Sequence, residues 1–355
     1  MRNLLLLLLL LLAVVVSADT SSPYHEINKK VPVINYQVAG IMEPTTLIGT
    51  IFGVMMNHMF PDWLILILLV SLLSYTAYKT ILKGNTIRGK ESKQQLLAVK
   101  SVFKGGPDGG GRGRQWSIYR RRNAVEKREM RLFPLKYILP LVFSWLVVLA
   151  QSMLRGGHGA PSVIGVACSS PDYWMITFLP MLILVMITFW VLSGYPFIEG
   201  DIHWIKSRVL IFPTLCTMAG VCAGLLGIGG GMVKGPIMLE MGILPAVQSA
   251  TANFMVLFTS SSTTLQFAIN GQFPGVLQYD YIAWFAFVGC LGGFCGQKVV
   301  AYLVKKYKRQ SIMVYILAAT IGLSAAAMGF IGLQSTMRDL EKGVHLGFHG
   351  ICDNE

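Results

Sequence analysis

A row of glycines followed by a lysine is the part of this sequence best suited to chemistry. Gly229, Gly230 and Gly231 are consecutive, and Lys234 lies three residues further on. Three such glycines do not sustain an isolated helix, because each costs about 1 kcal/mol relative to alanine. A helix that breaks there exposes N–H groups at the start of the next half-helix, where the helix dipole also favours an anion. Lys234, one turn further on, would add a full positive charge.

Two soluble phosphate-binding motifs do not explain this stretch. A dinucleotide fingerprint needs a preceding strand, whereas the flank here is an apolar helix. A P-loop needs Ser or Thr after its lysine, but Lys234 is followed by Gly235. The structural alternative is a tight helix crossing in which Lys234 extends to the membrane interface. We favour the anion site, because the crossing alone does not need glycines, lysine and proline together.

The apolar segment after the glycines is unusually rich in hydroxyl and amide side chains. Its first part contains Ser249, Thr251 and Asn253. On a helix, Ser249, Asn253 and Ser260 fall on one face. Such side chains can donate hydrogen bonds to an oxyanion while the segment stays neutral, and Asn253 is the strongest candidate. The alternative is hydrogen bonding between or within membrane helices.

No enzyme is expected. The apolar segments hold no paired carboxylates, no HExxH and no Ser/His/Asp set. Two acids in these segments, Glu43 and Glu240, stand alone in the sequence, and each is either a proton-coupling carboxylate or a structural residue. The six cysteines form no CxxC pair, so neither a metal site nor a disulfide framework is expected.

Composition defines the elements that must position these residues. Of the 355 residues, 54% are hydrophobic and 13% are charged, about half the charged fraction of a soluble domain. The excess lies in runs of about 20 residues, each long enough to cross a bilayer. The expected fold is therefore an all-α, polytopic transmembrane helix bundle. Its predicted spans are 38–58, 62–82, 137–154, 173–194, 209–227, 247–269, 281–304 and 311–333, with 227–245 a re-entrant half-helix or a separate crossing.

Most of the formal charge of +13 lies in one segment. Residues 83–136 hold 15 of the 30 Lys and Arg residues and four acids, which leaves a net +11 there. The positive-inside rule makes this segment a cytoplasmic loop, glycine-rich and partly disordered, rather than a nucleic-acid site. It is either a solvated face or a contact for anionic lipid headgroups. The basic cluster at 305–309 lies on the same side only if 209–245 crosses the membrane twice, and we prefer that count.

The N-terminus predicts entry into the secretory pathway. Residues 1–18 have a basic start, an apolar core and a small-residue cleavage site, as in a signal peptide. A cleaved signal followed by two ordinary spans would leave the loop at 83–136 outside, which conflicts with its charge. One N-terminal assignment is therefore wrong, or a piece is missing. The expected location is an endomembrane or the plasma membrane.

Several motifs together resemble the TauE/SafE family of sulfite-exporter-like membrane proteins. They are Gly227 to Gly231, Lys234-Gly-Pro236, Gly242 to Pro245, Ala250-Thr-Ala252, Glu43-Pro44, Gly49 to Gly53, Asn57, Pro61-Asp-Trp63 and Lys83-Gly84. The resemblance implies two homologous halves, transport of sulfite or organosulfonate-type anions, and no organic cofactor. The long basic loop is similar to that of eukaryotic members. Only one glycine break is present, so the start of the first repeat is expected to be absent from this sequence.

We divide the chain into a signal peptide (1–18), a partial first repeat (36–84), the basic loop (85–136), connecting helices (137–194), a second repeat (209–333) and a polar tail (334–355). The function expected is a multi-pass transporter of a small anion. The rival is a non-transporting scaffold that binds lipid or a partner. A homo-oligomer, or a partner that completes the first repeat, would be compatible with the short first half.

Overall fold

The structure, a computed structural model, describes residues 34–103, 135–156, 162–166, 170–193, 206–228, 230–241, 243, 245–269, 279–307, 311–341 and 347. All regular structure in these ranges is α-helical, which confirms the all-α class. The helices are α2 (Tyr36–Met59), α3 (Asp62–Phe103), α5 (Leu135–Arg155), α6 (Pro171–Ser193), α7 (Lys206–Leu226), α8 (Gly231–Glu240), α9 (Pro245–Ile269), α10 (Tyr279–Tyr307) and α11 (Ser311–Glu341). Six of them are long and apolar enough to cross a membrane. The expected signal peptide and residues 104–134 of the expected loop lie outside the described ranges.

Each predicted span corresponds to a helix, but two helices run well beyond the expected ends. α3 continues to Phe103, so the first part of the segment expected as a loop is helical. α11 continues to Glu341, into the segment expected as a polar tail. The extension of α3 is supported from α11. The Glu91 carboxylate accepts hydrogen bonds from the backbone N–H and hydroxyl of Ser311, at 3.2 and 2.7 Å, and Tyr315 donates to Asn85 at 2.6 Å.

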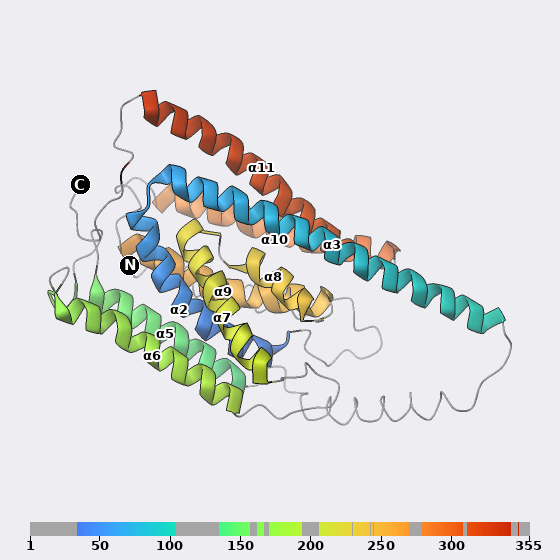
Figure 1. Cartoon of the computed structure of the whole chain (residues 1–355), viewed down its shortest axis with the longest axis horizontal. Coiled ribbons are helices and arrows are strands. Elements are labelled where there is room, and N and C mark those ends of the chain that lie inside the picture. The colour runs from blue at the N-terminus through green and yellow to red at the C-terminus, as the bar shows by residue number, and fades with distance from the viewer. Residues whose placement is uncertain are drawn as a thin grey trace.

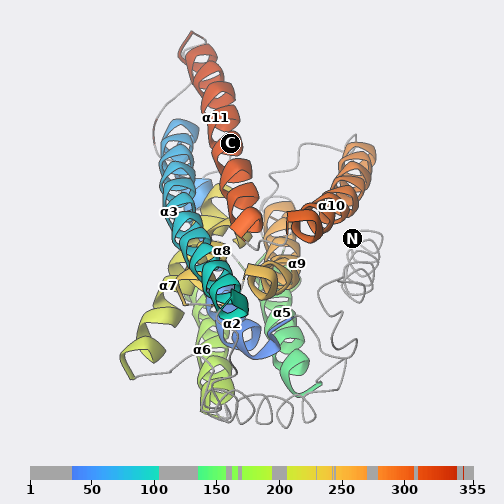
Figure 2. The same cartoon turned by 90° about the vertical axis from the view of Figure 1, so that its right-hand side faces the viewer.

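α2 is the central helix of the bundle. Figure 1 shows α5 and α6 along one side of it and α3 with α11 on the other, while α7 and α9 lie against it. Within the apolar window of α2, 89% of the residues are buried, compared with 6% in α10. Figure 2 shows α10 standing to one side of α3 and α11. α2 is therefore the helix of the bundle best shielded from the surroundings.

Small residues allow α2 to approach α7 very closely. Gly49 and Gly53 of α2 face Gly220 and Gly224 of α7, and a Cβ on any of the four would overlap backbone atoms of the other helix. The Gly49–Gly53 motif thus serves close packing between α2 and α7. The similar glycines of α10, beginning at Gly289, meet no neighbouring atom within 4 Å.

α8 reverses the direction of α7. Gly230, just before α8, lies against Ala223 of α7, and Met238 near its end packs with Cys216, further back along α7. The chain therefore runs out along α7 and back along α8 before α9 begins. With ten residues, α8 is the half-helix that the sequence predicts as one of two alternatives, and the Glu91–Ser311 contact shows that α3 and the start of α11 lie close together.

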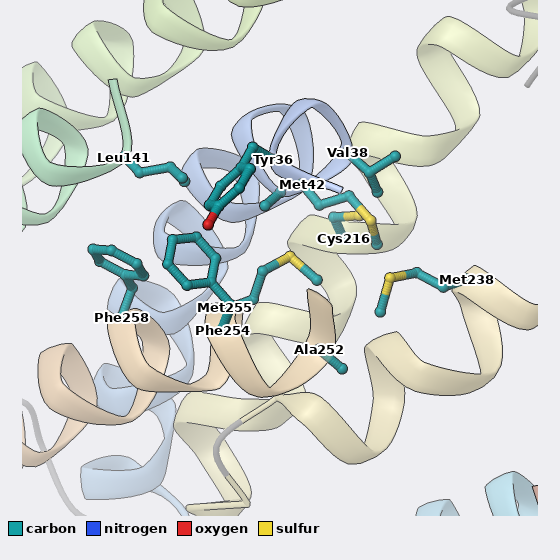
Figure 3. Packing of buried hydrophobic residues seen from close by; sticks show 11 residues of the cluster. Tyr36, Val38, Met42, Leu141, Cys216, Met238, Ala252, Phe254, Met255 and Phe258 are labelled. Atoms are coloured by element: carbon teal, nitrogen blue, oxygen red, sulfur yellow. The ribbon is translucent and has the colours of Figure 1, made fainter. Parts of the chain in front are cut away.

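A hydrophobic cluster joins five helices beside the glycine break. Figure 3 shows Met42 of α2, Leu141 of α5, Cys216 of α7, Met238 of α8 and Met255 of α9 directed toward one another. All five are buried. This packing fixes α8 against α2, α7 and α9, so polar groups at the same level are held away from solvent.

Candidate functional site

The helix breaks within the predicted glycine stretch. α7 ends at Leu226, and both Gly227 and Gly230 adopt left-handed backbone, with φ of 67° and 71°. Residues other than glycine rarely adopt this conformation, so glycine is strongly favoured at both positions. Gly231 differs from the expectation, because it is already the first residue of α8. Gly229 lies outside the described residues.

The start of α8 has the features of a helix N-terminus that favours negative charge. Gly230 precedes it and provides no side chain to cap the first N–H groups. Its carbonyl accepts hydrogen bonds from the backbone of Val233 and Lys234, at 3.2 and 3.0 Å. On the α7 side, Asn57 of α2 donates its amide to the Leu225 carbonyl at 2.7 Å. The break is therefore held from both sides, and α8 directs its positive end at it.

Three side chains from three helices form a closed polar network next to this break. The Lys234 ammonium lies 2.6 Å from Glu43 Oε2 and donates to Thr259 Oγ1 at 2.8 Å. The Thr259 hydroxyl lies 2.6 Å from Glu43 Oε1 and 3.1 Å from the Met255 carbonyl. Both carboxylate oxygens of Glu43 are thus engaged. We call Glu43, Lys234 and Thr259 the buried triad.

The buried triad has no contact with solvent. The side chains of Lys234 and Glu43 are 0% exposed, and Thr259 is buried. Two opposite charges in this setting are stable only as a well-formed, hydrogen-bonded pair, because each alone would cost several kcal/mol in lost solvation. The site as a whole is therefore neutral.

The structure corrects two expectations from the sequence. Glu43 does not stand alone, since it pairs with a residue 191 positions away. Glu240 does not stand alone either, because Lys79 of α3 lies 3.3 Å from its carboxylate on the surface. Lys234 is near the glycine break as predicted, but its charge is engaged by Glu43 and is not free for an anion in this conformation.

The three candidate residues of α9 lie in different surroundings. Thr251 is buried and accepts a hydrogen bond from the backbone of Asn35 at 3.0 Å, which ties α9 to the start of α2. Ser249 is partly buried, whereas the side chain of Asn253 is exposed. The structure therefore does not bring Ser249 and Asn253 to Lys234, and a contact of either with an anion stays a prediction.

The buried polar face of α9 is a different one from the face expected. It contains Thr259, Ser262 and Gln266, and Gln266 donates to Ser262 at 3.2 Å. Beside them, Trp145 of α5 donates its indole N–H to Ser261 at 2.8 Å. In the sequence, Thr259 is the first of six consecutive hydroxyl residues (259–264), and nothing there distinguishes it from the other five. Its contacts with Glu43 and Lys234 do so in the structure.

A second charged group, Arg155, is buried at the end of α5. The sequence predicts no function for it. The Arg155 guanidinium lies 5.5 Å from the centre of the Tyr173 ring. Its Nε and Nη1 are buried without a hydrogen-bond acceptor, and so is Oε1 of Gln151, one turn earlier, without a donor. Unlike Lys234, this cation has no carboxylate partner among the residues that the structure describes.

Fold and site together define a polytopic helical membrane protein with a broken helix and charged residues at its centre, the construction used by secondary transporters. A sequence model of the family described as "Sulfite exporter TauE/SafE" matches residues 116–328. The chain belongs to this family.

Among curated proteins, the chain is similar to three from Arabidopsis thaliana. It is 28% identical to Sulfite exporter TauE/SafE family protein 3, over 95% of this chain and 72% of that protein. Identity is 29% to family protein 1 and 27% to family protein 2, each over 90% of this chain and 72% of the relative. No solved structure matches the chain.

Proposed function

We propose that this protein transports a small anion, sulfite or an organosulfonate, across the membrane. The observation that carries the proposal is the position of Lys234. It is a fully buried cation, one turn into a half-helix whose N-terminus opens at a glycine break. Membership of a family of membrane transporters supports transport rather than catalysis, and intramembrane cations commonly mark an ion pathway.

The binding step would use Lys234 and the start of α8 together. An anion arriving at the break would accept hydrogen bonds from the first N–H groups of α8, next to Gly230 and Gly231. It would then compete with the Glu43 carboxylate for the Lys234 ammonium, which lies 2.6 Å from Glu43 in the resting arrangement. Ser249, Thr251 and Asn253 would line the route beyond this point.

The proposed setting is a membrane of the secretory pathway, either an endomembrane or the plasma membrane. The expected signal peptide supports it, and the six apolar helices support a multi-pass protein. The basic helix end of α3 would then face the cytoplasm, where its cations can contact anionic lipid headgroups.

The test is exchange of radiolabelled sulfite and methanesulfonate across vesicles that contain the purified, full-length chain. Lys234→Met alone would leave Glu43 buried and unpaired, so a loss of exchange could reflect unfolding. The double variant Glu43→Gln/Lys234→Met removes both charges and avoids this problem. We expect it to fold and to lose exchange, whereas Lys79→Met, which removes an exposed cation, retains it. Exchange by the double variant at the wild-type rate would refute the role of Lys234.

A further inference from the structure

We propose that Glu43 carries a proton in the transport cycle, so that one proton accompanies each monovalent anion. The inference rests on the proposed function and concerns what the anion site does with its own carboxylate. It begins from the neutrality of the buried triad, in which Glu43 cancels the charge of Lys234 at a position with no exposed surface.

The charge of the site decides what can bind. A monovalent anion beside Lys234 would give the site a net charge of −1 while Glu43 remains ionised. The anion would also have to displace the Glu43 carboxylate from the Lys234 ammonium. The carboxylate would then be buried without its cation. A lone buried charge costs several kcal/mol. A proton on Glu43 removes this cost, because the site is again neutral with the lysine, the anion and the neutral carboxyl in place.

Thr259 provides a hydrogen bond for both forms of Glu43. While Glu43 is ionised, the Thr259 hydroxyl donates to its Oε1 at 2.6 Å. Once Glu43 is protonated, its O–H can donate to the same hydroxyl oxygen, and the Thr259 hydrogen can turn to the Met255 carbonyl, 3.1 Å away. A hydroxyl rotates to suit its partners, so this exchange needs no movement of the backbone. The protonated carboxyl is thus satisfied after Lys234 has turned to the anion.

No other acid in the described part of the surrounding helices faces the pair. From α7 the nearby titratable group is the thiol of Cys216, which is buried. α5 presents Leu141 to this part of α2, and α6 presents Leu184. Glu240 of α8 is on the surface beside Lys79. Glu43 is therefore the acid in the described structure that can take the proton where the anion binds.

The experiment measures methanesulfonate uptake into vesicles that contain the full-length protein, with the membrane potential clamped at zero. A sulfonate stays monovalent throughout neutral and mildly acidic pH, so any effect of pH belongs to the protein. An inward proton gradient should drive accumulation, with one proton taken up per sulfonate. Glu43→Gln, a neutral stand-in for the protonated acid, should keep sulfonate exchange but lose accumulation driven by the gradient. Glu240→Gln, the same change at the exposed pair, should behave as wild type.

Thr259 gives a second, independent readout. Thr259→Ser keeps the hydroxyl and should keep gradient-driven accumulation, whereas Thr259→Val should lower it at least tenfold relative to exchange. Accumulation by Glu43→Gln at the wild-type level, or sulfonate uptake by the wild type without proton uptake, overturns the proposal. If the wild-type protein neither exchanges nor accumulates sulfite or methanesulfonate, the proposed function itself has failed.

A separate observation concerns Arg155, and from it we infer a second oxyanion site at the end of α5. Arg155 is 8% exposed, and Gln151, four residues earlier on the same face, is 2% exposed. Within the described ranges, two guanidinium nitrogens and the Gln151 amide oxygen are buried without hydrogen-bond partners. An unpaired buried cation is costly, and each orphaned polar group adds to the cost. An oxyanion bound to Arg155 would neutralise the charge and accept both hydrogen bonds.

The position of Arg155 indicates which side of the membrane this site serves. α5 begins at Leu135, after the basic segment, and crosses to end at Arg155. The site is therefore on the side opposite to the basic segments. The amide of Gln151 can rotate to present its N–H₂ to the same anion, while the face of Tyr173 closes the site behind the guanidinium. A free sulfonate and the phosphate of an anionic lipid share the chemistry that this site requires.

The test is the thermal unfolding of the full-length protein with added methanesulfonate or added phosphatidylglycerol. Each variant is compared with its own Tm in the absence of the anion. Arg155→Met should lose part of the stabilisation, whereas Arg338→Met, at an exposed arginine near the end of α11, should retain it. Loss with methanesulfonate identifies a site for free anions, and loss with the lipid alone identifies a headgroup site. Equal stabilisation of wild type and Arg155→Met by both probes overturns the inference.

Discussion

Gly49 of α2 and Gly220 of α7 lie so close that a Cβ on Gly49 would be 2.8 Å from the Gly220 Cα. The same Cβ would overlap the Thr217 carbonyl oxygen. One turn further on, Gly53 and Gly224 repeat the contact, with a Cβ on Gly53 placed 2.9 Å from the Gly224 Cα. Two helices thus meet through their backbones along two turns, and α2 carries Glu43 on the same rigid element. Backbone packing of this kind replaces the hydrophobic effect, which does not operate between helices in lipid.

Gly220→Ala should therefore destabilise the protein. The added methyl group meets backbone, which cannot rotate away, so α2 and α7 must separate. We expect a loss of about 1–3 kcal/mol, the usual cost of overpacking, measured as a lower Tm of the purified protein in detergent. Gly289→Ala in α10 is the matched control. Its methyl group meets nothing within 4 Å, and alanine favours a helix by up to about 1 kcal/mol, so its Tm should not fall.

Removal of one charge of the buried triad should be worse than removal of both. Lys234→Met leaves the Glu43 carboxylate buried without a cation, at a cost of about 3–5 kcal/mol. Glu43→Gln/Lys234→Met replaces the pair with neutral groups of similar size and should recover most of that loss. Stability against denaturant for the two single variants and the double variant gives the coupling directly.

The exposed pair of Lys79 and Glu240 supplies the comparison for this cycle. Its atoms are 3.3 Å apart, but the side chains are 45% and 56% exposed. A pair of this kind contributes about 0–1 kcal/mol. The same cycle at Lys79 and Glu240 should show little coupling. Additive effects at Glu43 and Lys234 would mean that the two charges do not depend on each other.

The sequence predicted the helices and the break because both depend on local properties. Runs of apolar residues define spans wherever they occur, and the glycines before Lys234 interrupt a helix through their own backbone freedom. The ends of α3 and α11 were placed too early, because the basic residues after Lys83 left the apolar pattern. The helical state of the α3 extension is supported by contacts such as Glu91 with Ser311 at the start of α11, which are 220 residues apart in the chain.

The buried triad could not be read from local pattern. The sequence marks Glu43 and Lys234 individually, but nothing close to either residue predicts their pairing across 191 residues. A rule was available, since a charge inside a membrane requires a partner, and applying it to both residues would have joined them. The expected polar face of α9 differs from the buried polar face for another reason. Several faces of that helix carry hydroxyl groups, so the sequence alone did not show that Thr259 is inside while Asn253 is exposed.

The C-terminal part of α3 and the C-terminal end of α10 should be accessible from the same side of the membrane. Cysteines introduced at Lys93 and Lys306, both exposed, should react with the same impermeant maleimide applied to one face of sealed vesicles. A cysteine at Ile164, which is 63% exposed in the segment between α5 and α6, should react only from the other face. Reaction of the Lys93 and Lys306 variants from opposite faces would contradict the placement of both basic segments on one side of the membrane.

Gly227 should tolerate asparagine better than valine, because its backbone is left-handed with φ of 67°. Asparagine adopts this region with little strain, whereas a β-branched residue is a clear outlier there. A Cβ at Gly227 meets no atom within 4 Å, so the effect is one of conformation alone. Gly227→Val should lower Tm and slow sulfite exchange, since relief of the strain would redirect the start of α8. Gly165→Val, at an open glycine with φ of 73° between α5 and α6, imposes the same strain away from the break. It should lower Tm by no more than Gly227→Val does and leave exchange unchanged; equal losses of exchange in both variants would show that the direction of α8 does not matter to transport.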